Sequence, residues 1–108
     1  MFPVVNASNF DEHVLNAKGI VLVNVWADWC EECWKMSNIM SKVYTFIDEQ
    51  DAIVQIDWDQ QKKLTNKLEV YGVPTLLIYA NGDEVARYSG MVNKGDLFMK
   101  LAKVKNRK

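Results

Sequence analysis

The sequence predicts an α/β fold in which helices cover both faces of a mixed β-sheet. Three observations support this prediction. Two short runs rich in β-branched residues, 20–27 and 52–58, have the composition of buried strands. Segments whose apolar residues recur with helical spacing lie between and after these runs. The Asn-Gly pair at 81–82 then connects two more strands, as in a hairpin with a tight primed turn.

The N-terminal segment is predicted to contain a short strand and a helix. We expect the strand at 4–6, directly after Pro3. The helix is expected at 8–16, because Ser8 and Asp11 have the spacing of a capping box. Together with the strand at 20–27, these elements form a first strand–helix–strand crossover.

A long amphipathic helix is predicted after the strand at 20–27. Cysteine and aliphatic residues recur along it at steps of three and four, namely Cys30, Cys33, Met36, Met40, Val43 and Ile47. This spacing places them on one face of the helix. We therefore expect a helix from about residue 30 to residue 48.

The second half of the chain is predicted to hold a strand at 52–58, a helix at 60–72, and hairpin strands at 75–80 and 83–90. A last helix is expected near Asn93, which has box-like spacing to Asp96. The order is βαβαβαββα. It predicts a central mixed sheet of four to five strands flanked by about four helices.

Length and charge limit the possible classes of function. With 108 residues, the chain fits a single domain, 1–108. The formal net charge is −1, from 13 basic and 14 acidic residues, so neither nucleic acid nor an anionic membrane is expected as a partner. The N-terminus lacks the regions of a signal peptide, and the run 20–27 is too short to cross a bilayer. We expect a cytoplasmic monomer.

Cys30 and Cys33 are the chain's two cysteines, and such a pair has three possible uses. A structural zinc site needs four ligands, and the one histidine, His13, falls on a different predicted helix. A structural disulfide at this spacing would close a very small loop and would therefore stabilise the fold little. A CxxC pair that opens a helix after a buried strand is typical of redox chemistry, which we favour.

Redox exchange gives each cysteine its own role. Backbone N–H groups and the positive end of the helix dipole favour the thiolate of Cys30. Cys33 lies one turn further along, on the face of Met36 and Met40, and should be shielded. We therefore expect Cys30 to attack a substrate disulfide and Cys33 to resolve the mixed disulfide. The sequence contains no Gly-rich phosphate loop, so no cofactor is expected.

Four stretches of the chain resemble the thioredoxin family: VLVNVWADWCEECWKM, YGVPTLLIY, NGDEV and SGMVNKGDL. The similarity extends from about Val5 to Val104. It implies a thioredoxin fold, reduction of disulfides in client proteins, and re-reduction by a separate thioredoxin reductase or equivalent donor. It also implies a cis peptide bond before Pro74, with the backbone of Val73 pairing with the substrate chain. From the residues alone, Pro74 would be a proline at a strand start.

The chain departs from the family pattern around the cysteines. Glu31 and Glu32 replace the usual Gly-Pro between them, and both also suit the first turn of a helix. Asn24 and Gln55 replace a buried aspartate and the lysine that pairs with it, and the two amides are expected to hydrogen-bond each other. The family's usual proton acceptor is then absent, and Glu32 or, less well, Asp57 is a candidate replacement.

The resemblance also implies a substrate-facing surface around Cys30. Its residues are Trp29, Trp58, Gly72, Val73, Pro74, Gly90 and Met91. Trp34 falls off the apolar face of its helix and should be exposed, either as a partner contact or against the first helix.

Three functions remain open from the sequence. The first is a carrier that reduces protein disulfides. The second is a dedicated relay, oxidase or isomerase that serves one client, which the atypical CEEC motif would suit. The third is a binding module that uses the fold without redox turnover, against which the intact cysteine pair argues.

Overall fold

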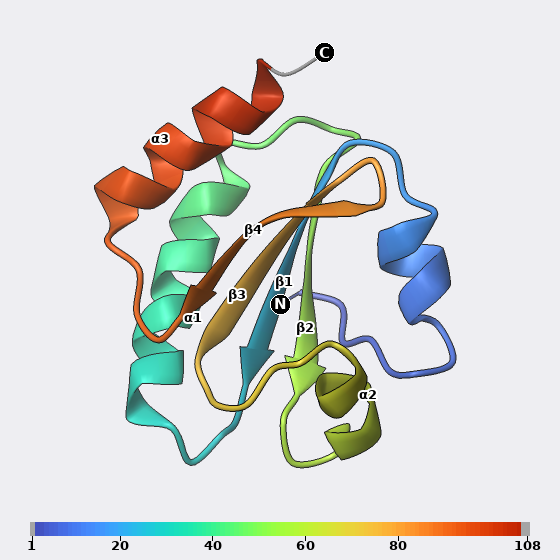
Figure 1. Cartoon of the computed structure of the whole chain (residues 1–108). Helices are drawn as coiled ribbons and strands as arrows, with labels where there is room; N and C mark the ends of the chain where they lie inside the picture. The colour runs from blue at the N-terminus through green and yellow to red at the C-terminus, as the bar shows by residue number, and fades with distance from the viewer. Residues whose placement is uncertain (1, 107–108) are drawn as a thin grey trace.

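Four strands form the mixed sheet that the sequence predicts, in the order β2-β1-β3-β4 (Figure 1). The computed structural model describes residues 2–106. The strands are β1 (Ile20–Trp26), β2 (Ala52–Asp57), β3 (Thr75–Ala80) and β4 (Asp83–Ser89). β1 runs parallel to β2 and antiparallel to β3, and β3 runs antiparallel to β4. The β3–β4 hairpin therefore adds the antiparallel half of the sheet.

Helices cover both faces of the sheet, as expected. They are η1 (Asp11–Leu15), α1 (Glu31–Tyr44), α2 (Lys62–Lys67) and α3 (Lys94–Lys105). α1 and α3 lie together on one face, and η1 and α2 lie on the other (Figure 1). None of the helices in residues 2–106 has both the length and the apolar character that crossing a membrane requires.

The alternation of side chains along β1 divides the core into two layers. Val21, Val23 and Val25 pack on the side of η1 and α2. Ile20 and Leu22 pack on the side of α1 and α3, against Met36, Met40, Leu97 and Leu101. Because side chains alternate along a strand, Asn24 shares the α1 side with Leu22. β1 therefore places the buried amide of Asn24 beneath α1, the helix that begins at the cysteines.

The N-terminal segment corrects two predictions. The expected strand at 4–6 is reduced to a single parallel bridge between Val4 and Gln55. The capping box at Ser8 is wrong, because the turn is instead closed by Asn6, whose Oδ1 accepts hydrogen bonds from the N–H groups of Ser8 and Asn9. The helix starts later than predicted and is a single turn, in which the N–H of Asn16 donates to the carbonyl of Asp11.

Two helices end earlier than the apolar pattern suggests. α1 ends at Tyr44 rather than near 48, where the hydroxyl of Thr45 turns back and donates to the Lys42 carbonyl at 2.8 Å. α2 ends at Lys67 rather than near 72. Glu69 has a φ of 59° and the N–H of Val70 donates to the Thr65 carbonyl, which together form a Schellman stop. Glycine is the usual residue at that left-handed position, so glutamate left no recognisable signal.

The hairpin and the last helix agree with prediction. Asn81 and Gly82 both have positive φ, 51° and 88°, as a primed two-residue turn requires. A side chain at Gly82 would collide with the carbonyl oxygen of Leu15, so this position has a second reason to be glycine. At the start of α3, Asn93 Oδ1 accepts the N–H of Asp96 at 3.1 Å.

Candidate active site

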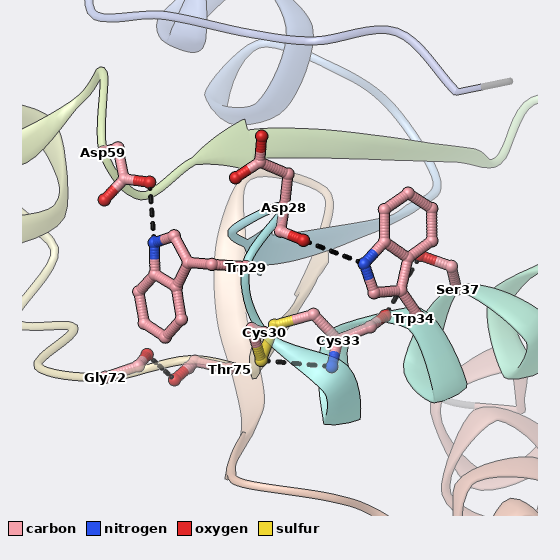
Figure 2. Close-up of a disulfide and its surroundings, with 9 residues drawn as sticks. All are labelled: Asp28, Trp29, Cys30, Cys33, Trp34, Ser37, Asp59, Gly72 and Thr75. Atoms are coloured by element: carbon pink, nitrogen blue, oxygen red, sulfur yellow. Dashed lines mark hydrogen bonds between the residues drawn. A yellow bond between two sulfur atoms is a disulfide. The ribbon is translucent and has the colours of Figure 1, made fainter.

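The cysteine pair lies where β1 ends and α1 begins, and it forms a disulfide (Figure 2). Cys30 is the N-cap of α1, with extended φ and ψ of −95° and 110°. Its Sγ accepts a hydrogen bond from the N–H of Cys33 at 3.1 Å. Cys30 is 8% exposed and Cys33 is 1% exposed. The sulfur of Cys30 therefore occupies the position of an ordinary helix cap, at the positive end of the helix dipole.

Apolar groups surround the disulfide. Ala27 is fully buried beneath it, and Trp26, Trp58 and Val73 pack around this cluster. The N–H of Trp58 donates to the carbonyl of Trp26 at 2.8 Å, which extends the pairing of β1 and β2 past the last ladder residue. A thiolate formed here would have helix N–H groups on one side and apolar side chains on the other.

The loop before β3 presents a strand-like backbone beside the disulfide. The Val73–Pro74 peptide bond is cis, as the resemblance implies. The loop is held by the Thr75 hydroxyl, which donates to the Gly72 carbonyl at 2.7 Å, and by the N–H of Gly90, which donates to the Pro74 carbonyl at 2.8 Å. The backbone of Val73 has no hydrogen-bond partner among residues 2–106. A pocket of about 300 Å³ adjoins this loop, lined by residues that include Tyr71, Gly72, Val73, Pro74 and Gly90.

Two exposed tryptophans lie on either side of the disulfide in Figure 2. Trp29 is 64% exposed, and its Nε1–H donates to the Asp59 carboxylate at 2.8 Å. Trp34 is 57% exposed, and its Nε1–H donates to the Asp28 carbonyl at 3.0 Å. Trp34 is therefore exposed as expected, but its ring meets Trp26 edge to face and not the first helix, and the partner contact stays a prediction. The role of Asp59 was not predicted, because nothing in the sequence of its loop indicates that it accepts a hydrogen bond from Trp29.

The remaining predicted surface residues are spread more widely. Trp58 is half-buried and lies under Lys62, whose Nζ is 4.0 Å from the ring centroid. Met91 is exposed on the loop that follows Gly90, and it is not part of the apolar cluster around the disulfide. The structure thus brings Trp58 and Val73 against the cysteines, with Met91 at the margin.

The two amides that replace the charged pair are neighbours, but Asn24 Oδ1 does not accept the hydrogen bond expected from Gln55. Asn24 and Gln55 face each other in the parallel register of β1 and β2. Gln55 Nε2 donates instead to the carbonyl of Phe2 at 3.0 Å. Asn24 is 1% exposed, and its Oδ1 accepts no hydrogen bond from residues 2–106. The side-chain amide of Gln55 therefore binds the backbone of the N-terminal segment.

The acids near the cysteines differ in what they contact. Glu31 and Glu32 are exposed in the first turn of α1, and neither forms an ion pair within residues 2–106. Asp57 Oδ1 accepts the N–H groups of Asp59 and Gln60 at 2.9 and 3.2 Å. Its carboxylate is thus used to hold the turn after β2. This makes Asp57 a weaker candidate proton acceptor than Glu32.

A CxxC disulfide at a helix start, beside a cis-proline loop on an α/β sheet, defines a thiol–disulfide oxidoreductase. The thioredoxin family model matches residues 1–103. The chain is 31% identical over 94 residues to a thioredoxin of Rhodospirillum rubrum, covering 87% of this chain and 90% of that protein. It is 32% identical over 94 residues to a thioredoxin of Chlamydia pneumoniae, covering 87% and 89%. The chain belongs to the thioredoxin family, and its activity is protein disulfide reduction.

A solved structure shares the fold. A mutant thioredoxin from Halobacterium salinarum NRC-1 superposes with a TM-score of 0.85 at 24% sequence identity. The alignment covers 98% of this chain and 92% of that one. The four-stranded mixed sheet flanked by helices is therefore a thioredoxin fold.

Proposed function

We propose that the chain reduces client disulfides in two exchange steps, with Cys30 as the nucleophile and Cys33 as the resolving cysteine. The thiolate of Cys30 attacks one sulfur of the client disulfide, forming a mixed disulfide and expelling the other client sulfur as a thiolate. The thiolate of Cys33 then attacks Cys30, which closes the Cys30–Cys33 disulfide and expels the second client thiolate. Both client thiolates take up protons, and the client gains two electrons.

One observation carries this assignment. The sulfur of Cys30 accepts the N–H of Cys33 in the first turn of α1 and is the more exposed of the two, while Cys33 is almost fully buried. A hydrogen bond and a helix dipole at the sulfur favour its anionic form once the disulfide is reduced. Burial restricts Cys33 to attack within the protein.

The client chain is proposed to lie along the cis-proline loop. The unpaired backbone of Val73 and the adjoining pocket suit an extended segment that adds as a short strand. Trp29, on the other side of Cys30, is held by Asp59 and offers an apolar contact. Gly72, Pro74, Gly90 and Met91 complete this surface.

The partners and the setting are also part of the proposal. Electrons return to the chain from a separate thioredoxin reductase or an equivalent donor, and the chain works as a single-domain monomer in the cytoplasm. The family membership supports a soluble electron donor, and the reducing cytosol suits a CxxC pair that cycles rather than one that stays oxidised.

Insulin reduction tests the assignment. With a general thioredoxin reductase as electron donor, the wild-type chain should precipitate insulin chains, and Cys30→Ser should not. Cys33→Ser should instead accumulate a mixed disulfide with the client. If Cys30→Ser is the variant that accumulates the mixed disulfide, the two roles are reversed.

A second candidate is a dedicated relay, oxidase or isomerase that uses the same two cysteines. The observation that favours it is the unusual surroundings of the pair, with two exposed acids between the cysteines and a buried neutral amide at Asn24. Such a protein would reduce insulin with dithiothreitol but fail with a general reductase. Turnover with both electron donors would favour the general carrier.

A further inference from the structure

We infer that Trp34 and Glu31 form a subsite for a cationic side chain, best an arginine, that lies close to the disulfide of the client. This inference rests on the proposed function, since it concerns the choice of client at the same site. It places a second contact on the α1 side of the disulfide, whereas the cis-proline loop contacts the client on the other side. The two together would select clients by the charge beside their cysteine.

The indole of Trp34 is exposed yet held in place. Its Nε1–H donates to the Asp28 carbonyl at 3.0 Å, and its ring lies 6.2 Å from that of Trp26 at an interplanar angle of 64°. More than half of its surface faces solvent. Because the Trp34 side chain is already ordered, a partner that contacts its ring loses little free energy to side-chain ordering, which favours binding.

The charges around Trp34 favour a cation over a purely apolar contact. Glu31 stands three residues before Trp34 on α1, so the two side chains share one face of the helix. Glu31 and Glu32 form no ion pair within residues 2–106, although Lys35 follows one turn later. A client cation would thus meet a carboxylate that has no ion-pair partner within residues 2–106, beside an aromatic ring.

A neighbouring tryptophan already holds a cation in the same way. Lys62 Nζ sits 4.0 Å from the ring centroid of Trp58, which packs against the disulfide. Among residues 2–106, no cation occupies the ring of Trp34. Arginine suits the vacant ring better than lysine, because its planar guanidinium stacks on the indole and can donate two hydrogen bonds to one carboxylate.

Single-turnover reduction of model disulfides tests this inference. Each substrate joins a cysteine peptide to a fluorescence quencher through a disulfide, and fully reduced protein releases the quencher. A series places arginine at each of the three positions before and after the cysteine, and a matched series carries citrulline, which has nearly the same shape without the charge. At the favoured position, the second-order rate constant should be about five- to tenfold higher for arginine. The ratio should fall as salt is added.

Variants separate the ring from the charge. Trp34→Phe keeps an aromatic face and should preserve most of the preference, whereas Trp34→Leu keeps apolar cover over Trp26 and should lose it. Glu31→Gln should lower the arginine-to-citrulline ratio and remove most of its salt dependence. Glu49→Gln is the matched control, because it removes an exposed acid beyond the other end of α1 and should leave the ratio unchanged.

The outcomes distinguish this inference from the function beneath it. An arginine-to-citrulline ratio near one at every position, with both series reduced, overturns the subsite and leaves the reductase activity standing. A ratio that survives Trp34→Leu also overturns it. If neither peptide series is reduced, the proposed function itself fails.

Discussion

The starts of α1 and α3 are built alike and do different work. At α3, Asn93 Oδ1 accepts the N–H of Asp96 at 3.1 Å. At α1, Cys30 Sγ accepts the N–H of Cys33, also at 3.1 Å. Both caps have extended backbone, and the first turn that follows holds two acids in α1 and one in α3. The side-chain amide of asparagine stays neutral at physiological pH. The sulfur of a cysteine, in contrast, can become a negatively charged thiolate once its disulfide is reduced. The same capping hydrogen bond thus stabilises the helix start at α3, whereas at α1 it also favours the thiolate of the reacting cysteine.

The surroundings complete the difference between the two caps. Asn93 is exposed to solvent, so its hydrogen bond only secures the helix. Cys30 is nearly buried, with Trp58 and Val73 packed against its disulfide. A helix start becomes a reactive site here because the sheet and the cis-proline loop enclose it, and the cap alone is insufficient.

The largest expected effect comes from removing the sulfur cap. Cys30→Ser keeps a side chain that can accept the N–H of Cys33, because serine is a good N-cap. The helix should therefore persist while insulin reduction falls to the uncatalysed background. Circular dichroism and the insulin assay measured on the same sample check both parts. Turnover above background in this variant would mean that the cap sulfur is not the reacting atom.

The next effect comes from restoring a carboxylate beneath α1. Asn24→Asp should fold, but burial should raise the pKa of the new carboxyl above that of an exposed aspartate. The folded state then holds the proton more tightly than the unfolded state, so the loss of stability relative to wild type is small at low pH and grows as pH rises through the raised pKa. We expect an additional loss of about 1–4 kcal/mol at pH 8 compared with pH 4. Urea unfolding across this pH range measures it.

The same variant should change how the resolving step depends on pH. A carboxylate at position 24 supplies a proton acceptor that the wild-type chain lacks there. Stopped-flow release of a client from a preformed mixed disulfide gives the rate of attack by Cys33 at each pH. Superimposable profiles for wild type and Asn24→Asp would show that proton transfer does not pass through this position.

A smaller effect is expected at the α3 cap. Asn93→Ala removes the side-chain acceptor for the N–H of Asp96 and should lower the free energy of unfolding by about 1 kcal/mol. Asn93→Ser should recover most of that loss, since serine caps nearly as well. Insulin reduction should be unchanged in both variants. A reduced rate at a temperature where both are fully folded would contradict a purely structural role.

The smallest effect concerns the acids that follow each cap. Glu31→Gln/Glu32→Gln removes two negative charges that oppose the thiolate of Cys30, so the reduced form gains stability and the reduction potential should rise. Solvent screens exposed charges, which limits the expected rise to roughly 10–30 mV, and added salt should shrink it. Equilibration against glutathione measures the potential.

Asp96→Asn at the start of α3 is the matched control for that measurement and should leave the potential unchanged. If the double variant has the wild-type potential, or a more negative one, Glu31 and Glu32 serve only the helix start.

Much of the fold could be predicted because its signals are local. The strands β1 and β2 and the Asn-Gly turn follow from β-branched runs and from residues that tolerate positive φ. The ends of α1 and α2 could not be predicted, since Thr45 and Glu69 stop these helices without the glycine that usually marks a stop. The site shows the same limit. Cys30 and Cys33 are evident from spacing, but the Trp29–Asp59 bond and the turn of Gln55 toward Phe2 depend on segments that only the folded chain brings together.

The accessibility of the two thiols tests the central claim most directly. The reduced protein is treated briefly with a limiting amount of iodoacetamide at several pH values, and mass spectrometry of the digested chain locates the label. If the sulfur at the helix cap is the nucleophile, Cys30 should carry nearly all of the label at every pH, including values below those at which a free thiol reacts. Labelling of Cys33 at an equal or greater rate would contradict the account.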